Sequence, residues 1–188
     1  MKSRMIPVLC ILLLFLTACQ KQTSDDPVVA TYKDTQIHES LVAYEKQNQI
    51  NVTGDKTVSD ADALDQLLLN LIMLDEAEQR GLSVTQEEVD AELAGQRKNY
   101  EEYEEVRSYI EEWCTKMGIT TEQYFDMVAE QLPRRMLRQR LRDTLGQEYC
   151  QQHGLEFTKV NPPEQMTEYV EQYLDGLLQA HRSEIKYY

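Results

Sequence analysis

One strongly apolar segment places the tightest limit on the fold. Residues 67–74 read LLLNLIML, inside a helical segment at 60–80 that is followed by Gly81. A helix that is apolar on nearly every side must be enclosed by neighbouring elements. Glycine just past a helix favours a left-handed cap that ends it. The sequence therefore predicts a mainly α-helical domain with this segment at its core.

Two local patterns predict where further helices begin. Thr85 with Glu88, and Thr120 with Gln123, have the spacing of a capping box, in which side chains satisfy the free amides at a helix start. Gly118 is expected to end the helix that precedes the second box. The pattern leaves open whether 86–117 is one helix or breaks between Gly95 and Tyr103. Pro133 should kink the helix that starts at Thr121 or begin a new segment.

The two ends of the chain are predicted to meet in a small sheet. Residues 28–37 have the pattern of a hairpin, followed by a helix at 38–49 and a loop at 51–59. At the other end, a connector at 146–163 leads to a helix at about 164–181. The alternating tail 184–188 can add a third strand, with Ile185 and Tyr187 on the face that packs against the helices.

The first residues have the composition of an export signal. Lys2 and Arg4 precede an apolar run of about a dozen residues, whereas a membrane-spanning helix needs about 20. Residues 16–19, LTAC, resemble a bacterial lipoprotein box, which implies cleavage between Ala18 and Cys19 and a lipid on Cys19. Residues 1–18 would then be the signal peptide and 19–27 a tether. The expected location is the extracytoplasmic face of the cell membrane, through the lipid anchor.

Composition argues against several classes of function. With a net charge of −14, the chain is repelled by nucleic-acid phosphates, so no nucleic-acid partner is expected. The three histidines, His38, His153 and His181, lack ligand spacing, so no metal site is predicted. No catalytic grouping and no cofactor motif is evident, and an enzyme is not expected. Cys114 and Cys150 could form a disulfide outside the cytoplasm or stay buried as free thiols.

A basic cluster at 134–142 has two interpretations. Its members are Arg134, Arg135, Arg138, Arg140 and Arg142. They could pair with the acidic stretch at 101–112 or be solvated. Alternatively, they could face anionic lipid headgroups or an acidic client.

An apolar stripe follows one side of the predicted helix before Gly118. Its members are Tyr103, Val106, Ile110, Trp113 and Met117, at helical spacings of three and four. Most of the stripe is expected to be core. The candidate residues for contact with a bound polypeptide are Tyr103, Tyr109, Trp113, Met117 and Met127.

Residues 28–37, followed by helices that include 64–93, resemble the amino-terminal chaperone domain of the SurA and PrsA foldases, and the resemblance covers roughly 28–145 and 164–188. The most specific part is EAEQRGLSVTQEEVDAEL at 76–93, and the tail YVEQYLDGLLQAHRSEIKYY resembles their last helix and strand. This resemblance implies a single SurA-N-like chaperone domain at 28–188. In those foldases a parvulin isomerase is inserted where this chain has only residues 146–163, whereas a domain needs at least about 50 residues. Lys33-Asp34 and His38 also depart from the family, which usually has Asn-Gly and a Ser or Thr cap there.

The resemblance implies a membrane-tethered chaperone module without isomerase activity. Its partners would be unfolded or newly exported polypeptides, bound by a concave apolar surface. The alternative is a structural or adaptor lipoprotein that uses the same fold to bind one specific envelope partner.

Overall fold

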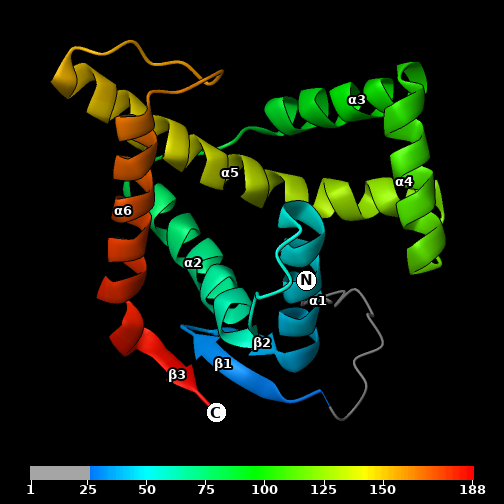
Figure 1. The fold of residues 1–188 in the computed structure, drawn as a ribbon, viewed down its shortest axis with the longest axis horizontal. Helices are drawn as coiled ribbons and strands as arrows, with labels where there is room; N and C mark the ends of the chain where they lie inside the picture. The colour runs from blue at the N-terminus through cyan, green and yellow to red at the C-terminus, as the bar shows by residue number, and fades with distance from the viewer. Residues whose placement is uncertain (1–25) are drawn as a thin grey trace, which may run out of the picture.

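The computed structural model describes residues 26–188 (Figure 1). The predicted signal peptide at 1–18, the cleavage site between Ala18 and Cys19, and the lipid attachment at Cys19 lie outside the described residues. Of the predicted tether at 19–27, only Asp26 and Pro27 are described. These N-terminal assignments stay predictions.

The described part of the chain is mainly helical, as predicted, with one small antiparallel sheet. Its elements are β1 (Val28–Tyr32), β2 (Thr35–His38), α1 (Glu39–Thr53), α2 (Asp60–Gln79), α3 (Gln86–Glu102), α4 (Glu104–Met117), α5 (Thr121–His153), α6 (Glu164–Ala180), η1 (Arg182–Glu184) and β3 (Ile185–Tyr187).

The sheet joins the two ends of the described chain in the order β2-β1-β3, with both pairs antiparallel. Lys33 takes a left-handed φ of 50° in the turn between β1 and β2, and Tyr32 pairs with Ile185 across the β1–β3 ladder. The predicted hairpin and third strand are both confirmed. Only Ile185 is buried, however, whereas Tyr187 is 49% exposed and its hydroxyl accepts a hydrogen bond from Arg182. The prediction that both side chains face the helices was therefore wrong for Tyr187.

The main core surrounds α2, as the all-round apolar pattern predicts. Leu68, Ile72 and Ala77 of α2 are completely buried in one cluster with side chains of the sheet, α1, α5 and α6. In Figure 1, α2 lies between α1 and α6, with the sheet below it and α5 crossing above.

A second, smaller cluster holds α3, α4 and the first part of α5 together. Its buried members are Ile110, Cys114 and Phe125, with the partly buried Leu93 and Tyr124 packed against them. The helix α5 is the only helix that contributes buried residues to both clusters, among the residues described. It therefore connects the two parts of the molecule (Figure 1).

Both predicted capping boxes form, at Thr85 and at Thr120, and Gly81 and Gly118 take left-handed φ values of 71° and 67°. The sequence did not predict a third box, in which the Ser59 side chain accepts from the Asp62 amide at the start of α2.

Several boundaries differ from the prediction. The helix α1 continues past Gln49 to Thr53, where Gly54 takes a left-handed cap. The open question about 86–117 is decided by a break at Tyr103, which has an extended ψ of 115°.

Helix α5 runs from Thr121 through Pro133 to His153, so of the two alternatives for Pro133 the start of a new segment was wrong. Buried Leu132 and Leu141 lie on either side of the proline and hold the helix in place. Residues 146–153, predicted as connector, are helical because Gly146 and Cys150 are buried in this last part of the helix. The connector is therefore limited to 154–163.

Cys114 and Cys150 are both free and buried. Cys114 belongs to the second cluster, whereas Cys150 lies near the end of α5. The disulfide alternative is therefore wrong for this structure.

Candidate functional site

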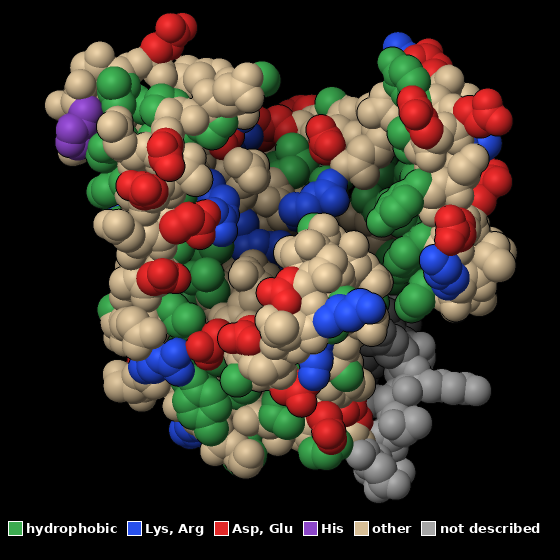
Figure 2. Space-filling view, in the orientation of Figure 1, with side chains coloured by type: hydrophobic (Ala, Val, Ile, Leu, Met, Phe, Trp, Pro, Cys, Tyr) green, Lys and Arg blue, Asp and Glu red, His purple; other side chains and the backbone are tan. Residues whose placement is uncertain are grey.

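One face of the molecule is hollowed between its two parts (Figure 2). We call this region the hollow. The helix α4 forms one side, the part containing α1, α2 and α6 forms the other, and the middle of α5 lies between them. Because α5 contributes to two separate hydrophobic clusters, the part of α5 between them forms the base of the hollow.

The α4 side of the hollow is apolar. Helix α4 buries Ile110 and Cys114 in the second cluster, while three large apolar side chains, two in α4 and one on the residue just before it, are exposed. These side chains, which we call the α4 wall, are Tyr103 at 51% exposed, Tyr109 at 69% and Met117 at 46%. Figure 2 shows hydrophobic side chains along this side of the hollow. Such a patch is a surface on which another apolar group can be buried.

The remaining two candidate contact residues differ from the α4 wall. Trp113 is half-buried, and its ring meets the ring of Tyr124 edge-on with centroids 5.5 Å apart. It is therefore mainly part of the second cluster. Met127 is 36% exposed on α5. Of the predicted stripe, Ile110 is buried, Val106 and Trp113 are intermediate, and both ends are exposed.

The floor of the hollow is basic. Figure 2 shows Lys and Arg side chains gathered over the middle of α5. Three arginines of this part of α5, which we call the arginine floor, are Arg134, Arg135 and Arg138, and they span little more than one helical turn. Within residues 26–188, no carboxylate oxygen lies within 4.0 Å of any of the three.

The electrostatics of Arg138 reflect this crowding of like charges. Burial, followed by the charge of Arg134, lowers the pKa of Arg138 below its usual value, and Arg135 and Arg142 act in the same direction. Glu45 of α1 is the one acidic group that opposes them. Around Arg138, the positive charges of three neighbouring arginines are thus opposed by the one negative charge of Glu45.

The other two members of the basic cluster hold the fold together. Arg140 pairs with Glu88 of α3 at 2.5 Å and also donates to the Ser83 carbonyl, while Arg142 pairs with Glu171 of α6 at 2.7 Å. None of the cluster's ion pairs within the described residues reaches the acidic stretch at 101–112. The expectation that the cluster pairs with that stretch was therefore wrong, because α5 presents it to other elements.

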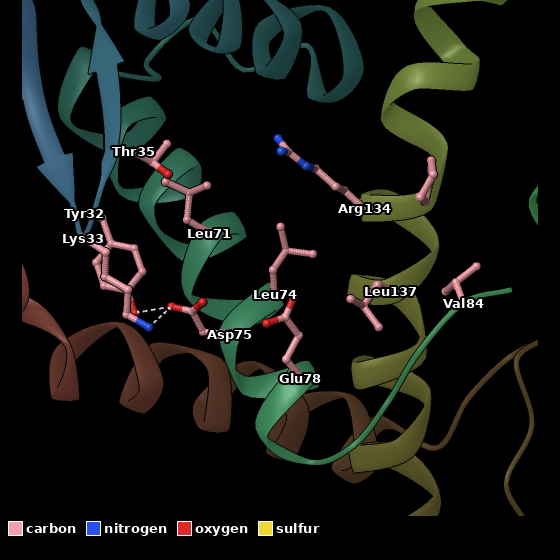
Figure 3. Close-up of a pocket in the computed structure, with 11 residues that line it drawn as sticks. Tyr32, Lys33, Thr35, Leu71, Leu74, Asp75, Glu78, Val84, Arg134 and Leu137 are labelled. Carbon is pink, nitrogen blue, oxygen red and sulfur yellow. Dashed lines mark hydrogen bonds and ion pairs between the residues drawn. The ribbon is translucent and has the colours of Figure 1, made fainter. Parts of the chain in front are cut away.

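A second concave region, the hairpin groove, lies where the β1–β2 turn meets α2 and α5 (Figure 3). Its volume is about 360 Å³. The side chains that line it include Tyr32, Lys33, Leu71, Leu74, Asp75, Glu78 and Leu137, together with Arg134 of the arginine floor, which reaches into the groove from α5.

The polar centre of the hairpin groove is Asp75. The Tyr32 hydroxyl donates to its carboxylate at 2.7 Å, and the Lys33 ammonium lies 2.6 Å from the same oxygen. Burial alone would raise the pKa of Asp75, but the hydrogen bonds from Lys33 and Tyr32 outweigh burial and lower it. Burial and the bond to Asp75 raise the pKa of Tyr32. This mutually satisfied set holds the hairpin on α2 rather than leaving a reactive group free.

No group of three or more His, Cys, Asp or Glu side chains in the described structure could hold a metal ion. None of its helices is long and apolar enough to cross a membrane.

Sequence reasoning did not identify Asp75, Tyr32 or Glu45 as parts of a site. The one available signal was the pair Asp75-Glu76, two acidic residues directly after the apolar run at 67–74. Comparison of the chain with protein-family models, curated proteins and solved structures found no match. The functional proposal therefore rests on the geometry of the hollow and the hairpin groove.

Proposed function

We propose that this protein is a membrane-tethered, extracytoplasmic chaperone-like module that binds unfolded or newly exported polypeptides. The observation that carries the proposal is the hollow, whose α4 wall exposes large apolar side chains beside a concave floor. An extended polypeptide could bury its own apolar side chains against this wall without any catalytic group. Aromatic and methionine side chains suit such binding because they adapt to varied partners.

The resemblance to the chaperone domain of SurA and PrsA foldases supports the same proposal. The segment 76–93 has the helix, glycine cap, capping box and second helix that the resemblance implies, and β3 pairs with β1. Between α5 and α6 only residues 154–163 are available, which is far too short for an isomerase domain. The proposed module therefore acts by binding, and a peptide assay should show no saturable acceleration of X-Pro isomerisation.

Membrane attachment through Cys19 is a separate part of the proposal. It rests on the lipoprotein box, and two or more acyl chains would make the attachment stable. The variant Cys19→Ser should leave the membrane fraction or remain uncleaved. Unchanged incorporation of labelled fatty acid in that variant would contradict the anchor and leave the binding proposal intact.

The decisive experiment measures suppression of aggregation of a chemically unfolded protein by the full chain. The double variant Tyr109→Ser with Met117→Ser removes two exposed members of the α4 wall. Burying such a side chain contributes about 1.5–3 kcal/mol. The double variant should therefore need an at least tenfold higher concentration than the parent for the same suppression.

The matched control is Val160→Ser with Tyr188→Ser, which removes two side chains that are 76% and 77% exposed in the connector and at the C-terminus. It should suppress aggregation as well as the parent does. Equal activity of both variants would contradict the role of the α4 wall. Capture of a single envelope protein, with no suppression of general aggregation, would instead support the adaptor alternative.

A further inference from the structure

The hollow combines two surfaces of different chemistry. The α4 wall is apolar and exposed, and the arginine floor carries positive charge with no carboxylate within 4.0 Å in the described structure. In a chain with a net charge of −14, most basic groups have acidic neighbours, as Arg140 and Arg142 do. Arginines without acidic neighbours at the base of a concave surface form a candidate binding site for an anionic ligand.

We propose that the arginine floor binds acidic segments of extended polypeptides, whose neighbouring apolar side chains rest on the α4 wall. This inference rests on the proposed function and names the class of polypeptide that the hollow selects. Guanidinium groups suit carboxylates because their planar donors match both carboxylate oxygens. The spacing of Arg134, Arg135 and Arg138 over one helical turn lets successive acidic side chains be bound together.

The shape and charge of the surroundings favour a polypeptide over a membrane surface. The Lys and Arg side chains lie at the bottom of the hollow, with Asp and Glu side chains on both sides of it (Figure 2). An anionic bilayer is flat, so the acidic sides would repel it before its headgroups reached the arginines. A single extended chain is narrow enough to enter.

The half-buried position of Arg138 strengthens the case. Its lowered pKa arises from burial and from Arg134, so an incoming carboxylate would relieve an unfavourable concentration of positive charge. Glu45 already supplies part of this compensation, and Gln49 donates a 3.0 Å hydrogen bond to its carboxylate. Glu45 thus competes with the ligand for the arginine floor.

The test compares two labelled peptides with the full chain in detergent micelles. Both contain the same leucine and phenylalanine residues, and one has glutamate where the other has glutamine. Because each exposed charge pair adds modestly to affinity and several pairs can form, the acidic peptide should bind about tenfold more tightly at low salt. That preference should shrink as salt increases.

Variants localise the effect. Arg134→Gln with Arg135→Gln and Arg138→Gln should abolish the preference, whereas replacing the same three residues with lysine should retain most of it. The control Lys56→Gln, Lys98→Gln and Lys186→Gln makes the same change in net charge at exposed positions elsewhere and should bind like the parent. Glu45→Gln should bind the acidic peptide more tightly. Circular dichroism and thermal unfolding verify that each variant is folded.

The outcomes separate this inference from the proposed function. Equal binding of the two peptides would overturn the inference and leave polypeptide binding supported. Suppression of aggregation without binding of either peptide would also overturn the inference alone. A further outcome is that phosphatidylglycerol in the micelles displaces the acidic peptide. If the lipid bound as tightly as the peptide and depended on the same arginines, the arginine floor would be assigned to lipid. Loss of both peptide binding and suppression in the parent would overturn both proposals.

Discussion

At the scale of residues, a few polar side chains hold the sheet on the helical core. The hydroxyl of Tyr32, which is 2% exposed, bonds to Asp75 of α2 and lies 3.3 Å from Nδ1 of His181. Another example is Asp26, whose carboxylate accepts from the amide and hydroxyl of Ser40 at the start of α1. Asp26 thus supplies the cap that the His38 side chain does not provide, although Asp26 lies 14 residues before Ser40 in the sequence.

Replacing Tyr32 with phenylalanine should lower the free energy of unfolding by about 1.5–3 kcal/mol at pH 7, because the lost hydrogen bond is to a charged carboxylate. The pKa of Asp75 is lowered in the folded state, so this carboxylate stabilises the fold above its unfolded pKa of about 4 and loses that effect as the pH falls. The difference between parent and variant should therefore shrink below about pH 4.

Urea unfolding at pH 7 and pH 3 measures this difference. The control Tyr44→Phe removes a hydroxyl from a side chain that is 46% exposed and should change stability by less than about 0.5 kcal/mol. A Tyr32→Phe effect of the same size at both pH values would show that the Asp75 charge does not matter.

At the scale of elements, α5 determines the shape of the molecule. It carries Phe125 into the second cluster and Leu141 and Leu145 into the main one, so the hollow depends on its remaining a continuous helix. Its contact with the region around α6 is close at Gly146. A Cβ atom there would lie 3.0 Å from the Met166 sulfur and 3.1 Å from Phe157.

Two glycine-to-alanine variants test this close contact. At Gly176, on the exposed side of α6, no atom lies within 4 Å of an added Cβ, so Gly176→Ala should stabilise the protein by about 0.5–1 kcal/mol. Gly146→Ala gains the same helix propensity but overpacks its neighbours, which costs about 1–3 kcal/mol. In denaturant unfolding it should be less stable than Gly176→Ala. Equal stabilisation by both substitutions would mean that the Met166 and Phe157 side chains move aside at no measurable cost in stability.

At the scale of the whole molecule, the two ends of the described chain pair with each other in one sheet. Strand β3 pairs with β1, and buried Ile185 joins the cluster around α2. The sheet would otherwise be a two-stranded hairpin, which is marginal in water. The C-terminal residues therefore stabilise a fold that begins more than a hundred residues earlier.

Deleting residues 184–188 should lower stability by several kcal/mol. Burial of Ile185 contributes about 1.5–3 kcal/mol and each ladder hydrogen bond about 0.5–1.5 kcal/mol. The control Lys186→Ser with Tyr187→Ser keeps the ladder and Ile185 and removes only exposed side chains, so it should melt close to the parent. A truncated chain that melts like the parent would contradict closure by β3.

The sequence by itself determined the features that depend on residues a few positions apart. Thr85 with Glu88 and Thr120 with Gln123 mark helix starts because each box closes within one turn. Gly81 marks a helix end because it takes a left-handed φ at little cost. The apolar run in α2 predicted an enclosed core helix, since burial of such a segment is favourable in any arrangement of neighbours.

Only the tertiary structure decided the features that depend on distant partners. The break at Tyr103, the continuity of α5 through Pro133 and the exposure of Tyr187 follow from which surfaces meet, which local pattern does not encode. The same holds for the candidate site. The sequence identified the basic cluster and all three members of the α4 wall, but Arg140 and Arg142 found ion-pair partners while the arginine floor, within the described residues, did not. Charge pairing is decided by distances of a few ångströms between elements far apart in the chain.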